Sequence, residues 1–106
     1  MSCDLPPLDK DGYLLQLSSW SRDIGEQLAR NENIELTQAH WEVIDTVQAF
    51  YQEFDLAPAS RALVRYIQQK LGPEKGRSLY LLSLFPPHPA LIIAKIAGLP
   101  RPANCF

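Results

Sequence analysis

The chain has 106 residues, of which 46% are hydrophobic, 9% aromatic and 21% charged. This length and composition predict one globular domain, residues 1–106, with a modest core. No apolar run approaches the ~20 residues that a membrane-spanning helix needs. Residues 1–17 also lack the basic start and the apolar stretch of a signal peptide, so we expect a cytoplasmic protein.

The charges are distributed unevenly along the chain. Residues 1–56 carry three basic and eleven acidic side chains, a net charge of −8, whereas residues 57–106 carry seven basic and one acidic side chain, a net charge of +6. A basic field of this kind attracts anionic partners or stabilises a thiolate. Solvated lysines and arginines on helix surfaces explain the same pattern equally well.

The first 18 residues contain a strong turn signal. The dipeptide Asp11-Gly12 is typical of a tight turn, and Tyr13–Leu17 after it is typical of a short strand. We therefore expect a small β-hairpin or meander in residues 1–18.

Residues 19–97 show helical periodicity interrupted by helix-ending residues. The first expected helix begins after an N-cap at Ser19 or Ser21 and fades at residues 31–33, and the second follows an N-cap at Thr37 and ends near Phe54. A third helix opens at Pro58 and stops at residues 72–73. Residues 78–85 form a fourth, short helix, and residues 90–97 form a last helix that is apolar nearly all round.

Residues 98–106 form a proline-stiffened C-terminal arm that carries Cys105. Cys3 and Cys105 have no metal-ligand spacing. They could form a bridge, but a reducing compartment disfavours disulfides, so we expect two free thiols. The Cys105 thiol is the one intrinsically reactive group in a suggestive position, and it needs its thiolate form to react. Arg101, or Arg61 and Arg65 if the arm folds back, would favour that form, and the terminal carboxylate would oppose it.

A nucleic-acid-binding role is an alternative interpretation. Thr37–Leu71 has the rhythm of a helix-turn-helix, in which the second helix carries Arg61 and Arg65. The acidic first half of the chain weakens this interpretation, which also leaves Cys105 without a role.

Several motifs resemble those of one known family. The segment Leu36–Ile44 is similar to its "LT-x-x-HWEVI" signature, and Pro58–Val64 is similar to its "P-x-x-R-x-L" step. Leu84–Ala90, Lys95–Pro102 and Cys105 are similar to "LFP…PA…KIAGLPKP…C". This is the TusE/DsrC family, which includes the sulfur-relay protein TusE and the gamma subunit of dissimilatory sulfite reductase, and the resemblance covers about residues 9–106.

The resemblance implies an α+β, mostly helical fold, in which a small N-terminal β-hairpin or meander packs on an array of about five helices. It also implies that Cys105 carries sulfur covalently as a persulfide, a sulfurtransferase activity that needs no cofactor. DsrC proteins have a second cysteine eleven residues upstream, where this chain has Ala94. This difference indicates the single-cysteine, TusE-like branch.

The partners that the resemblance implies are an upstream sulfur-relay complex and the thiouridylase that makes 2-thiouridine at the tRNA wobble position. The alternative is a DsrC-like subunit or regulator of a sulfite reductase or sulfur-oxidation system. Two segments depart from the family pattern. Leu91-Ile92 stands where members usually have Lys-Gln, and residues 1–8 do not resemble the usual first strand.

Overall fold

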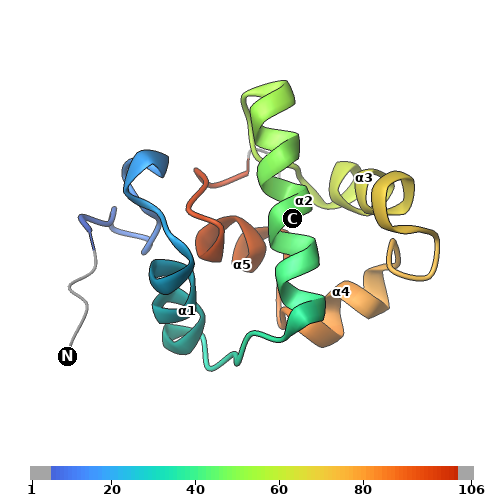
Figure 1. Ribbon diagram of the computed structural model, residues 1–106, viewed down its shortest axis with the longest axis horizontal. Helices are drawn as coiled ribbons and strands as arrows, with labels where there is room; N and C mark the ends of the chain where they lie inside the picture. Colours follow the sequence, from blue (N-terminus) through green and yellow to red (C-terminus); the bar gives the residue numbers. More distant parts are fainter. Residues whose placement is uncertain (1–5, 103–106) are drawn as a thin grey trace.

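The computed structural model describes residues 6–102, and in this range the protein is helical (Figure 1). The helices are, in chain order, η1 (a 3₁₀-helix, Leu17–Ser19), α1 (Arg22–Asn31), α2 (Gln38–Phe54), α3 (Ser60–Leu71), α4 (Ser78–Leu84) and α5 (Pro89–Ile96). The molecule extends over 39 × 26 × 22 Å. Figure 1 shows α1 and the N-terminal loop on one side of α2, and α3 on the other.

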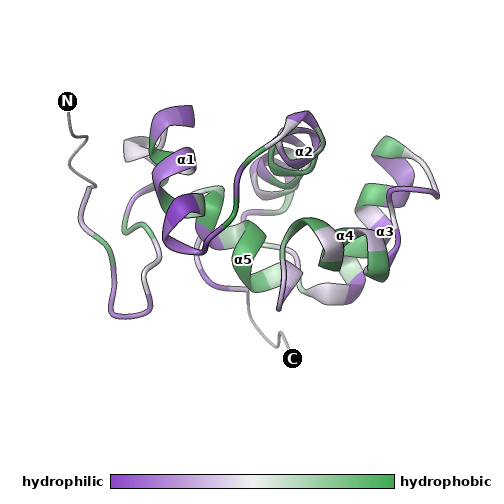
Figure 2. Ribbon diagram, turned by 90° about the horizontal axis from the view of Figure 1, so that it is seen from below, coloured by the Kyte–Doolittle hydropathy of each residue, from purple (hydrophilic) through white to green (hydrophobic). Residues whose placement is uncertain are grey.

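Helix α5 is the centre of the fold, because α1, α2, α3 and α4 all pack against it. Its sequence is apolar nearly all round, as Figure 2 shows, and such a helix is stable in water only when it is buried. Its buried residues are Ala90, Ile92, Ile93, Ala94 and Ile96. Ile92, one of the two residues that depart from the family pattern, is therefore absorbed by the core.

The first two helices begin as their capping residues predict. The Ser21 side chain accepts a hydrogen bond from the backbone N–H of Ile24 at the start of α1. Thr37 is the N-cap of α2, and His40 Nδ1 accepts from the Thr37 backbone N–H at 3.0 Å. Because that N–H can only donate, the His40 proton lies on Nε2, which donates to the Leu84 carbonyl at 2.8 Å. A buried histidine thus joins the start of α2 to the end of α4.

The third helix begins later than expected. Its first residue is Ser60, with Ala59 as the N-cap, so Pro58 precedes the helix instead of occupying its first turn. Gly72, at a φ of 108°, ends the helix as predicted.

The predicted β-hairpin in residues 1–18 is wrong, because residues 6–18 contain no strand. The turn itself is present: Gly12 has a φ of 88°, and its N–H donates to the Asp9 carbonyl at 3.0 Å. The pairing stops at one isolated bridge, between Leu8 and Leu14. Pro7 offers a carbonyl but no N–H, so it accepts from Leu15 and cannot complete a ladder. Residues 1–5 lie outside the part that the structure describes.

No single helix between residues 6 and 102 is long and apolar enough to cross a membrane. Helices α4 and α5 would reach that length only together, and a bend of 49° separates them.

Candidate functional site

The C-terminal arm is the candidate functional site, and the structure describes its first five residues, 98–102, which we call the root. Cys105, the predicted sulfur carrier, and Cys3 lie outside the described residues. The geometry of the site is therefore the geometry of the root and of the side chains that hold it.

The root begins with a tight reversal at the end of α5. Gly98 has a φ of 78°, its N–H donates to the Lys95 carbonyl, and the N–H of Leu99 donates to the Ala94 carbonyl at 2.9 Å. This pair of bonds is the Schellman motif, which ends a helix and turns the chain back on itself. Leu99 is 0% exposed, so the arm leaves the core from a buried anchor.

Two side chains from distant parts of the chain hold the last carbonyls of α5. Trp20 Nε1–H donates to the Ile96 carbonyl at 2.7 Å, and Gln48 Nε2–H donates to the Ala97 carbonyl at 2.8 Å. The last carbonyls of a helix have no partner within it, so these bonds satisfy groups that would otherwise be buried and unpaired. A Cβ atom added to Gly98 would lie 2.6 Å from the Trp20 ring, so the indole packs directly on the root.

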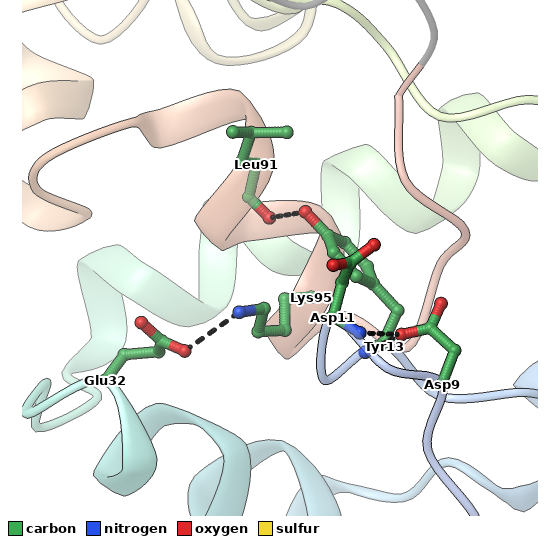
Figure 3. Close-up of polar contacts among 6 residues, drawn as sticks. All are labelled: Asp9, Asp11, Tyr13, Glu32, Leu91 and Lys95. Carbon is green, nitrogen blue, oxygen red and sulfur yellow. Dashed lines mark hydrogen bonds and ion pairs between the residues drawn. The ribbon is translucent and has the colours of Figure 1, made fainter.

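The N-terminal loop also contacts the root. Asp9 Oδ1 accepts from the backbone N–H groups of Asp11 and Tyr13, both at 2.9 Å, which fixes the loop (Figure 3). Asp11 then faces Arg101, with the guanidinium 3.7 Å from the carboxylate. Both side chains are about half exposed, so this ion pair contributes little to the stability of the protein.

A second set of contacts fastens the same loop to α5. Lys95 pairs with Glu32, the C-cap of α1, at 3.1 Å, and its ammonium lies 5.3 Å from the centre of the Tyr13 ring. The Tyr13 hydroxyl donates to the Leu91 carbonyl at 3.3 Å (Figure 3). Loop, α1 and α5 therefore form one unit from which the arm emerges.

The predicted binding residues do not gather at one place. Arg101 lies in the root, whereas Arg61 and Arg65 lie on α3 and line a hollow of about 340 Å³ with Val64 and Gln68. Figure 1 shows α3 and the N-terminal loop on opposite sides of α2. Between residues 6 and 102, no group of three or more His, Cys, Asp or Glu side chains is placed to hold a metal ion.

Sequence reasoning missed the roles of Trp20 and Gln48. Trp20 fits an apolar stripe, which predicts burial of its ring but gives no partner for its N–H. The sequence does indicate an unusual role for Gln48, because this polar residue stands at helical spacing between Ile44 and Tyr51 on the apolar stripe of α2. A polar residue on a core-facing stripe requires a buried hydrogen-bond partner, and here that partner is the end of α5.

Comparisons with known proteins cover nearly the whole chain. Residues 5–106 match the family model described as DsrC like protein. The chain is 54% identical over 98 residues to the Sulfurtransferase TusE homolog of Haemophilus influenzae, covering 92% of this chain and 90% of the relative. It is 52% identical over 98 residues to Sulfurtransferase TusE of Yersinia pseudotuberculosis, covering 92% and 91%.

Solved structures show the same fold. The NMR structure of Allochromatium vinosum DsrC has a TM-score of 0.84 at 42% identity and covers 93% of this chain and 88% of that one. The oxidized gamma-subunit of dissimilatory sulfite reductase from Archaeoglobus fulgidus has a TM-score of 0.81 at 33% identity, covering 95% and 92%.

Proposed function

Because this chain belongs to the DsrC-like protein family, we propose that it is a sulfur-relay carrier whose Cys105 thiol accepts a sulfur atom and passes it to a partner enzyme. Relatives about half identical over most of the chain are named sulfurtransferases, which supports sulfur transfer as the activity. The structural observation that carries the proposal is the anchored root, where Leu99 is buried and both Trp20 and Gln48 bind the end of α5.

The proposed chemistry is an exchange between sulfur atoms. The Cys105 thiolate attacks the outer sulfur of a persulfide on the donor protein, a new S–S bond forms at Cys105, and the donor's own S–S bond breaks. The donor cysteine leaves as a thiolate, so no net oxidation or reduction occurs. The sulfur stays covalently bound, and the step needs no cofactor.

The root limits where this chemistry takes place. Cys105 follows Pro102 by three residues, and three extended residues span about 10 Å. In this proposal the thiol therefore meets its partners within about 10 Å of Pro102, which is buried. Arg101, which pairs with Asp11, is the one cationic residue of the root.

The donor and acceptor in this proposal are those that the similarity to TusE implies. Ala94 is buried in α5 and stands where the resemblance to DsrC proteins places a second cysteine, which supports a one-thiol carrier. The donor in this proposal is an upstream relay complex, and the acceptor is the thiouridylase that makes 2-thiouridine in tRNA, both in the cytoplasm. Service to a sulfite reductase core is the second candidate, because dissimilatory sulfite reductase I is a structural neighbour at a TM-score of 0.70 and 26% identity.

Mass spectrometry of the sulfur-loaded protein tests this proposal. After incubation with a cysteine desulfurase and relay proteins, the peptide that contains Cys105 should gain about 32 Da, one sulfur atom, as expected for a persulfide. The Cys3→Ser variant is the matched control and should load as well as the wild type. Loading on Cys3, or sulfur relay by a Cys105→Ser variant, would refute the assignment of the carrier residue.

A further inference from the structure

A hollow between α3 and α4 lies away from the root, and we call it the α3–α4 groove. It has an apolar part of about 170 Å³ and a wider part of about 340 Å³, which share Ser60, Val64 and Ser78. A third hollow continues it past Val64 and Ser78 towards the end of α3. Figure 2 shows α3 and α4 side by side at one end of the molecule, with α1 at the other.

The floor of the groove is apolar and open to solvent. Leu63 and Leu81 form its buried base, whereas Leu82 is 39% exposed and Leu79 is 78% exposed. These two α4 leucines are among only five large hydrophobic residues exposed in the described part of the chain. Contiguous exposed apolar surface beside a hollow is typical of a protein–protein contact site.

The rim of the groove is cationic. Arg61, Arg65 and Arg77 line it and are exposed. None of the three forms an ion pair within residues 6–102. Glu74 is the one carboxylate among the residues that line the groove in the described range. Three guanidinium groups therefore face solvent around an apolar floor.

We infer that the α3–α4 groove is a docking site for an acidic, amphipathic segment of a partner protein. Such a segment places carboxylates against the three arginines and apolar side chains against Leu79 and Leu82. A nucleic-acid backbone would use the charges and leave the leucines in water, because phosphate contacts are electrostatic. Arginine beside an apolar centre is the composition typical of protein interfaces.

The site is separate from the sulfur chemistry, because no groove residue belongs to the arm. It adds a recognition surface to the carrier proposed above and does not depend on Cys105. Loading of Cys105 and binding at the groove can therefore fail or succeed independently, and the experiment uses the Cys105→Ser protein to keep them apart.

The test measures binding of a labelled synthetic helix with glutamates along one face and leucines along the other, by fluorescence anisotropy. We expect binding that weakens at least about fivefold in the double variant Arg61→Glu/Arg65→Glu, because two attractive pairs are replaced by two repulsive ones. Leu79→Ser should also weaken it, and this exposed position leaves the fold intact. The control Arg30→Glu, on α1, makes one arginine-to-glutamate reversal away from the groove and should alter affinity less than about twofold.

Four outcomes would overturn the inference. The first is no binding, and the second is equal binding of a control helix whose leucines are replaced by serines. The third is an equal loss of affinity in the Arg30→Glu control. The fourth is displacement of the peptide from Arg61 and Arg65 by single-stranded DNA that binds more tightly, which would identify a nucleic-acid site instead.

Discussion

The root of the arm and the α3–α4 groove lie in the same basic half of the sequence. They differ in whether their polar groups have partners among residues 6–102. In the root region, Lys95 and Arg101 each face a carboxylate, and side chains satisfy the last carbonyls of α5. At the groove, Arg61, Arg65 and Arg77 have no acidic partner among residues 6–102, and leucines are exposed.

The difference explains the uneven charge of the chain. Three of the four ion pairs in the described range join an acid from residues 1–56 to a base from residues 57–106, namely Glu42–Lys75, Glu32–Lys95 and Asp11–Arg101. The acidic half therefore neutralises the basic half where the two pack together. The groove arginines lie beyond that contact, so their charge is available to a partner. The polar groups of the root, by contrast, are paired within the chain.

The largest loss of stability should come from Gly98→Ala, which changes the first residue of the root. An alanine there has a left-handed φ of 78° and a Cβ only 2.6 Å from the Trp20 ring. Strain and overpacking together should lower the free energy of unfolding by about 2–4 kcal/mol. Urea denaturation measures this change.

Gly72→Ala is the control for this prediction, because it separates the two causes. Its φ of 108° imposes the strain, but the nearest atom to an added Cβ is Glu74 Oε1 at 3.7 Å. It should cost about 1–2 kcal/mol. Equal losses for the two variants would show that the Trp20 contact does not hold the root.

The second effect should come from Gln48→Met, which keeps the volume and removes the donor to the Ala97 carbonyl. Ala97 is 0% exposed, so its carbonyl would be left without a partner, at a cost of about 1–3 kcal/mol. Gln52→Met makes the same change on the exposed face of α2 and should change stability by less than about 0.5 kcal/mol. Similar values for both would mean that the amide bond at the root contributes nothing.

Local rules predicted the helices well, because caps and stripes are encoded in a few neighbouring residues. Ser21 and Thr37 begin helices, and Gly72 and Gly98 end them, as their conformational preferences require. The hairpin failed because the turn at Gly12 is a local feature, whereas a ladder needs donors on both strands, and Pro7 has none.

The site could be predicted only in part. The arm and its cysteine are visible in the sequence, and the role of Cys105 stays a prediction. The side chains that hold the root could not be paired in advance, because Trp20 and Gln48 reach the end of α5 from 76 and 49 residues away along the chain. Such contacts depend on how the helices pack, which periodicity does not specify.

A third, smaller effect should be a difference in coupling energy between the two ion pairs near the root. The side chains of Lys95 and Glu32 are 20% and 25% exposed, whereas those of Arg101 and Asp11 are 57% and 44% exposed. Water screens the second pair more, so double-mutant cycles should give a coupling energy of about 1 kcal/mol for the first and less than about 0.5 kcal/mol for the second. A larger value for the Arg101 pair would show that the root is held mainly from the loop side.

The smallest effect should be a loss of stability at alkaline pH through Lys75, which lies in the loop between α3 and α4. Its hydrogen bond to Glu42 raises the pKa of the ammonium above 10.5, an effect opposed by partial burial. A pKa raised by folding stabilises the folded protein below 10.5, and that contribution disappears as pH rises through the raised value. The stability difference between wild type and Lys75→Met, from urea unfolding, should therefore be constant near neutral pH and shrink above pH 10.5.

The control for this last experiment is Lys10→Met, because Lys10 is exposed and takes part in none of the ion pairs between residues 6 and 102. Its difference from wild type should stay small over the whole pH range. A Lys75→Met difference that does not shrink at alkaline pH would mean that the pair with Glu42 does not stabilise the fold. The charge of Lys75 would then be open to a partner, like the charges of the groove arginines. The loop between α3 and α4 would then count as part of the α3–α4 groove.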